Sequence, residues 1–142
     1  MIGGNIHELR KRSNVFVKNL NLHVAEVIES SSSTIVKLNQ KQLKESKLTT
    51  GQSITPLYSP AYAKRKGYRK PDGYLTGEMY REMEAIANET NNTWFVTSFA
   101  DHTRFFVGRY KKVFGLTKEN QSKAQKVTIP KMRALYNKLV LS

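Results

Sequence analysis

The stretch Asp72-Gly73-Tyr74-Leu75-Thr76-Gly77-Glu78-Met79-Tyr80-Arg81-Glu82-Met83 joins the most basic loop of the chain to its clearest strand pattern. With the preceding proline, its first two residues have turn chemistry, because proline presets φ, aspartate supplies a side-chain acceptor and glycine tolerates positive φ. Thr76 can then cap a short helix, and Glu78 in the first turn is favoured by the positive end of the helix dipole. The stretch therefore predicts a turn followed by a short helix.

A β-hairpin is expected after this stretch. Residues 84–89 and 93–99 flank a polar turn, and the second segment is rich in aromatic and β-branched residues that favour strands. Alternation places Trp94, Val96 and Ser98 on one face and Phe95, Thr97 and Phe99 on the other. An isolated hairpin is marginal in water, so we expect helices to cover it or strands of other subunits to extend it. The candidates for oligomerisation are Trp94, Phe95, Val96 and Phe99.

The N-terminal part predicts two helical segments. From Ile6 to about Glu29, apolar residues recur at three- and four-residue intervals, which is typical of an amphipathic helix. The four serines at 30–33 are expected to separate two helices or to bend one, since serine is a good N-cap. A second helical pattern then continues to about Glu45.

Residues 47–75 predict an extended basic arm with one short helix inside it. The first part, 47–59, has no period, and three side chains are expected to anchor it: Ile54, Leu57 and Tyr58. Ser59 and Pro60 begin the short helix as N-cap and first helical residue, and Gly67 ends it.

Five positive charges fall within seven residues of this arm: Lys64, Arg65, Lys66, Arg69 and Lys70. Basic residues interleaved with aromatic ones grip phosphates and stack on bases, so these five side chains are candidate contacts to DNA or to a partner. Two other interpretations remain open. The segment is a solvated surface loop in one, and an arm that docks on an acidic partner subunit in the other.

The C-terminal part predicts three helices. Residues 101–114 have a helical pattern with Asp101 as N-cap. A cap at Thr117 begins a second helix that runs to about Lys126. Pro130 opens the last helix, whose apolar stripe is regular: Met132, Leu135, Tyr136, Leu139 and Val140.

At 142 residues the chain fits one α+β domain with three parts: helical (1–46), the extended arm (47–75), and the hairpin with the C-terminal helices (76–142). We expect the long N-terminal helix and the C-terminal helix to pack on a small antiparallel sheet. The net charge of +13 predicts attraction to nucleic acid, an anionic membrane or an acidic protein. Without cysteine or a long apolar run, we expect no thiolate chemistry, no signal peptide and no transmembrane helix.

No motif for catalysis, a cofactor or a metal is recognisable in the sequence. The three histidines, His7, His23 and His102, lie in no known motif. Three glutamates could supply paired carboxylates: Glu78, Glu82 and Glu84. An exposed acidic helix face that pairs with Arg81 or with the basic loop explains them better. We therefore expect a protein that is not an enzyme and that uses no cofactor or metal.

Four segments resemble a family of small structural proteins of tailed bacteriophages. They are Ile54-Thr55-Pro56-Leu57-Tyr58-Ser59, Tyr62-Ala63-Lys64-Arg65-Lys66, Leu75-Thr76-Gly77-Glu78-Met79-Tyr80, and Tyr110 with Val113-Phe114-Gly115-Leu116-Thr117. Their order is similar to that in the virion-morphogenesis group, which includes head-tail connector and tail-completion proteins. The chain departs from the group in its strong basic loop and in lacking the usual acidic segment after the sheet.

This resemblance implies a non-enzymatic subunit that forms a ring at the neck or tail of a virion. Such a subunit would be synthesised in the cytoplasm of the bacterial host and would join other neck or tail proteins, with the basic loop facing DNA or an acidic neighbour. The alternative function, suggested by charge, is a small basic nucleic-acid-binding protein. No helix-turn-helix spacing supports that alternative convincingly.

Overall fold

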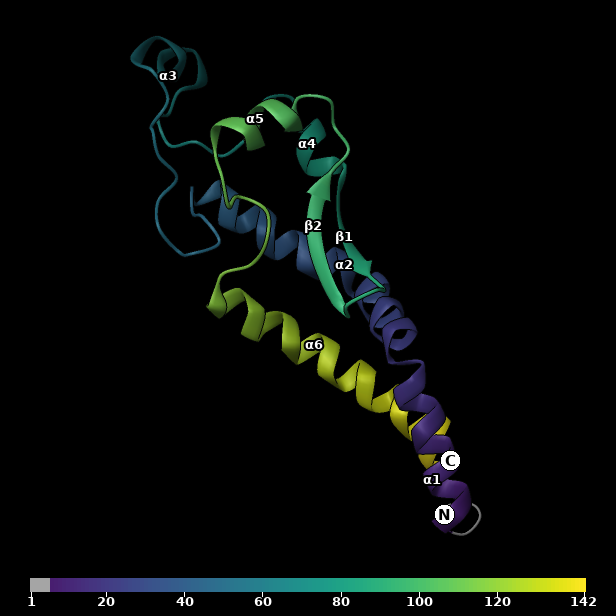
Figure 1. The fold of residues 1–142 in the computed structure, drawn as a ribbon. Coiled ribbons are helices and arrows are strands. Elements are labelled where there is room, and N and C mark those ends of the chain that lie inside the picture. The colour runs from purple at the N-terminus through teal and green to yellow at the C-terminus, as the bar shows by residue number, and fades with distance from the viewer. Residues whose placement is uncertain (1–5) are drawn as a thin grey trace.

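The computed structural model describes residues 6–142, which form an α+β fold (Figure 1). The elements in chain order are α1 (Ile6–Lys18), α2 (Leu20–Lys44), α3 (Pro60–Lys66), α4 (Glu78–Arg81), β1 (Met83–Asn88), β2 (Thr93–Ser98), α5 (Thr103–Arg109), α6 (Lys118–Tyr136) and the π-helical end η1 (Asn137–Leu141). Figure 1 shows the hairpin against α2, with α1 and the C-terminal end together at one end of the molecule and α3 at the other. The predicted fold class is confirmed.

Helix α2 carries the centre of the core. Its buried side chains Ile28, Ile35 and Leu43 recur at seven- and eight-residue intervals, so they lie along one face of the helix. Met79 and Val113, from segments far along the chain, complete the same apolar cluster. The sheet and the C-terminal half are therefore assembled on the N-terminal helix. Helix α2 packs on the sheet as the sequence predicted, whereas α6 packs mainly on α2 rather than on the sheet.

The helix break lies at Asn19, so the prediction of a break or bend at the four serines is wrong. Helix α2 continues through them; the first and fourth serines are exposed, whereas the middle two serines are covered. Ser31 is buried, and the hydroxyl of Ser32 accepts a hydrogen bond from the backbone N–H of Ala85 in β1 at 3.1 Å. Small side chains let the strand approach the helix closely, and this tertiary contact outweighs the local preference of serine for caps.

The hairpin has the predicted strands and alternation. Its strands pair antiparallel, with Met83 opposite Ser98 and Ala85 opposite Val96. Val96 and Ser98 are buried towards the core, whereas Phe95 and Phe99 remain 50% and 62% exposed. The hairpin therefore has one covered face and one exposed aromatic face.

The two caps of α3 and the N-cap of α6 are also as predicted. The hydroxyl of Ser59 accepts from the N–H of Tyr62, Gly67 ends α3 with a φ of 86°, and the hydroxyl of Thr117 accepts from the N–H of Asn120. These caps depend on neighbours in the sequence, which is why local patterns find them.

Other predicted boundaries and anchors need correction. Gly77, not Thr76, precedes α4 as N-cap, and His102, not Asp101, precedes the short α5. The arm is anchored by fully buried Ile54, but Leu57 remains 44% exposed. These predictions used local patterns alone, and packing at each site decided otherwise.

Helix α6 runs without interruption through Pro130, although two helices were predicted there. A proline inside a helix removes one backbone hydrogen bond. Helix α6 packs along α2, with Ala124 buried between them, and the Nζ of Lys131 donates to the carbonyl of Ser30 at 2.7 Å. These contacts hold the helix together on both sides of the proline.

Two buried amides of α2 fix the segment that leads into α6. Asn39 donates to the carbonyl of Val113 and accepts from the N–H of Gly115, at 3.1 and 3.0 Å. Gln42 donates to the carbonyl of Gly115 at 3.1 Å and accepts from the N–H of Thr117 at 3.0 Å. This irregular segment thus obtains its hydrogen bonds from side chains, since no strand or helix supplies them.

Candidate functional site

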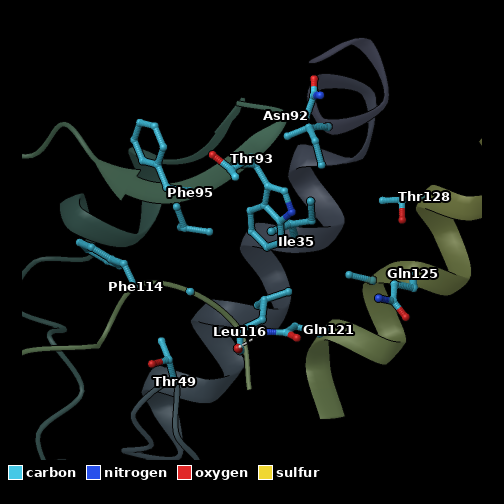
Figure 2. A pocket seen from close by; sticks show the side chains of 15 residues that line it. Ile35, Thr49, Asn92, Thr93, Phe95, Phe114, Leu116, Gln121, Gln125 and Thr128 are labelled. Carbon is cyan, nitrogen blue, oxygen red and sulfur yellow. Dashed lines mark hydrogen bonds between the residues drawn. The ribbon is translucent and has the colours of Figure 1, made fainter. Parts of the chain in front are cut away.

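An open groove lies between β2, α2 and α6 (Figure 2). Its volume is about 590 Å³. Figure 2 shows Ile35 of α2 in the middle of the groove, and Gln121, Gln125 and Thr128 along α6 on the side opposite β2. Trp94 and Val96 line the β2 side. The groove therefore has an apolar floor and one polar wall.

The two edges of the sheet differ. The N–H of Ala85 donates to the hydroxyl of Ser32, so it points away from β2 and towards α2, which covers the β1 edge there. In an antiparallel pair, the facing residue Val96 must then also direct its N–H and C=O away from its partner strand. No other segment of residues 6–142 hydrogen bonds to the backbone of Val96 at that outer edge. The β2 edge is open, and an open edge is a template for another strand.

The structure divides the four candidates for oligomerisation between two surfaces. Trp94 and Val96 belong to the face that packs on α2 and borders the groove. Phe95 and Phe99 belong to the opposite, exposed face, although Phe95 also lines part of the groove. Both side chains are among the large apolar residues that the described part of the chain leaves exposed.

Lys66 differs from the other four cations of the basic loop. Its Nζ lies 3.7 Å from the Oδ1 of Asp72, donates to the carbonyl of Tyr74 and lies 5.0 Å from the ring centroid of Tyr68. Lys64, Arg65, Arg69 and Lys70 are exposed. The five cations predicted to act together are therefore four surface charges and one internal charge.

Asp72 organises the surroundings of Lys66. Its carboxylate accepts from the hydroxyl of Tyr68 at 2.7 Å and from the N–H of Tyr74 at 3.0 Å, and its backbone carbonyl accepts from the hydroxyl of Tyr80 at 2.6 Å. Burial raises the pKa of Tyr80, and the nearby Asp72 carboxylate raises it further. The raised pKa values of Tyr68 and Tyr80 keep their hydroxyls protonated as donors at neutral pH, and these hydrogen bonds hold the loop to the body of the protein.

A second groove, between α3 and α5, joins segments about forty residues apart in the sequence. Its volume is about 650 Å³, and its lining includes Tyr62 and Arg65 from α3 and Phe105 and Arg109 from α5. Tyr74, from the loop between these helices, also lines it. The sequence predicted the two segments separately, because no local pattern indicates that they meet.

The candidate acids and bases are not brought together. The ring of His23 stacks on Phe16 with centroids 4.4 Å apart, whereas His102 lies in the groove between α3 and α5. Arg81 donates to the carbonyl of Thr76 and forms no ion pair with a glutamate within residues 6–142. The predicted pairing of Arg81 with the acidic face is therefore wrong.

In the part of the chain that the structure describes, no cluster of three or more potential metal ligands occurs. None of the helices in residues 6–142 is both long and apolar enough to cross a membrane. No protein-family model, curated protein or solved structure matches the chain.

Proposed function

We propose that this chain is a non-enzymatic structural subunit of a tailed-phage virion, which forms a ring at the head-tail connector or tail-completion position. The observation that carries the proposal is the open β2 edge beside an apolar groove, while α2 covers the opposite edge. The resemblance of four sequence segments to virion-morphogenesis proteins supports it. The subunit would be synthesised in the host cytoplasm and incorporated into the particle.

The two edges restrict how neighbouring subunits can join. Since β1 is covered, a hairpin cannot pair its β1 with the β2 of a neighbour. The neighbour can instead present its own β2, which gives a two-fold pair, or place a different extended segment along β2, between β2 and α6. Contacts between two different surfaces of identical subunits generate closed rings when the rotation closes. A ring would therefore use the second arrangement, in which the groove receives a segment other than β2.

The test uses a matched pair of substitutions on α6. Gln125 lines the groove, and Ser122 is an exposed residue of the same helix outside it. Gln125→Lys places a charge where the incoming segment would lie, while Ser122→Lys adds the same charge elsewhere. Light scattering over a range of protein concentrations should show an oligomer for the wild type and Ser122→Lys, and a smaller species for Gln125→Lys. A wild type that remains monomeric at every concentration would refute self-assembly through this groove.

A second candidate function is nucleic-acid binding. It is favoured by the exposed side chains Lys64, Arg65, Arg69 and Lys70 in a chain of net charge +13. In this case the loop contacts phosphates, and the affinity falls steeply as salt rises. Both functions are compatible with the same loop, so DNA binding is measured separately from assembly.

A further inference from the structure

The groove between α3 and α5 has a distinctive composition. Its lining contains six aromatic side chains and two arginines, Arg65 and Arg109, and it contains no lysine and no carboxylate. Aromatic residues and arginine are enriched at the centres of protein interfaces, whereas lysine and acidic residues are depleted there. The three lysines of the basic loop, Lys64, Lys66 and Lys70, lie outside this lining. The composition therefore points to a protein ligand.

The two guanidinium groups are held in place by aromatic rings. The Cζ of Arg65 lies 5.3 Å from the ring centroid of Tyr62. The Cζ of Arg109 lies 5.6 Å from the ring centroid of Tyr110, and its Nε donates to the Tyr110 hydroxyl at 3.2 Å. Within residues 6–142, neither arginine forms an ion pair. Two positioned guanidinium groups without anions are suited to bidentate contacts with carboxylates.

The apolar part of the groove is exposed. Leu75 and Phe105 both line it and are 57% and 67% exposed. Side chains of this size are costly to leave in water, and burying one contributes roughly 1.5–3 kcal/mol. A volume of about 650 Å³ lies within the usual range of roughly 300–1,000 Å³ for ligand pockets, so a short segment fits better than a folded domain.

We propose that this groove binds an extended acidic segment of a partner protein, which inserts an aromatic or large aliphatic side chain against Leu75 and Phe105. Carboxylates of the same segment pair with Arg65 and Arg109. Charge complementarity supports this occupant, because the walls are cationic and the chain as a whole carries +13. The proposal does not depend on ring assembly, since the groove lies between α3 and α5 and not at β2.

The experiment measures the binding of three fluorescent probes to the full chain by anisotropy. The first is a peptide in which aspartate and glutamate alternate with phenylalanine and leucine. The second has the same charge, with serine in place of the apolar residues. The third is an oligothymidylate of equal net charge. The first peptide should bind at least about tenfold more tightly than the other two probes.

Matched variants locate the binding. Arg65→Gln and Lys64→Gln remove the same charge from adjacent exposed positions, but only Arg65 lines the groove. Arg65→Gln and Phe105→Ser should each weaken binding of the first peptide about tenfold, and Lys64→Gln should leave it within about twofold. Circular dichroism checks that each variant is folded.

Three results would overturn the proposal. Equal binding of the two peptides, or equal effects of Arg65→Gln and Lys64→Gln, would show nonspecific attraction to charge. Preference for the oligothymidylate would assign the groove to nucleic acid. Failure of the first peptide to bind would show that the groove is not a binding site for acidic segments. None of these results depends on the oligomeric state measured for the Gln125→Lys variant.

Discussion

Replacing Asn39 by alanine should destabilise the protein more than any surface change. Asn39 is fully buried, and its amide bonds to the carbonyl of Val113 and to the N–H of Gly115. The truncation leaves two backbone groups without partners, and each buried unsatisfied group costs roughly 1–3 kcal/mol. The expected decrease is about 2–6 kcal/mol, a large share of the roughly 5–15 kcal/mol that stabilises a typical domain.

The assay is urea unfolding followed by circular dichroism, at one protein concentration for all variants because assembly shifts apparent stability. For a chain of 142 residues, a decrease of about 3 kcal/mol in stability also lowers Tm by roughly 10 °C. The control is Lys37→Ala, an exposed substitution on the same helix, which should change stability by less than about 0.5 kcal/mol. If Asn39→Ala costs no more than Lys37→Ala, the amide does not hold the segment before α6 and the reasoning fails.

Two further predictions concern the basic loop and its surroundings. If the loop contacts DNA, replacing its four exposed cations by serine should reduce the salt dependence of DNA binding; these cations are Lys64, Arg65, Arg69 and Lys70. The slope of the logarithm of the binding constant against the logarithm of the salt concentration should become shallower by roughly 0.9 for each phosphate that the loop no longer neutralises, as measured by titration with duplex DNA. The charge-matched control replaces four exposed lysines elsewhere in the chain by serine: Lys37, Lys41, Lys118 and Lys126. An equal effect of the control would exclude a specific role for the loop. Because burial raises the pKa of Tyr80 in the folded chain above its ordinary value of about 10, the folded state keeps this proton longer than the unfolded state. Its contribution to stability is complete below about pH 10 and is lost as the pH rises further, so the unfolding free energy should fall as the pH rises above about 10, and less steeply in Tyr80→Phe. An equal slope in the variant would show that Tyr80 is not responsible.

Local patterns predicted those parts of the fold that depend on near neighbours. Alternation in residues 93–99 gave the two faces of the hairpin, and Ser59 and Thr117 cap the helices that follow them. The uninterrupted helix through the serines of α2 was missed, because the strand that covers Ser31 and Ser32 lies more than fifty residues later. Periodicity carries no information about such a partner.

The candidate site was predicted only in part, for the same reason. The charges of the loop could be counted, but the inward position of Lys66 depends on Asp72 and on tyrosines from several segments. Sequence spacing gave no indication that Arg65 and Arg109 would line one groove. A dense alternation of tyrosines with cations, as in residues 58–74, is nevertheless a signal that some of those cations are internal.

The hydrogen bond from Ala85 to Ser32 also limits misassembly. Proteins with two free strand edges can stack side by side without end, which is how fibrils grow. Here, two hairpins can meet only through their β2 strands, and that pair has no free edge left for a third copy. At high protein concentration, one hydroxyl group on α2 thus helps to keep the sheet from acting as a seed for aggregation.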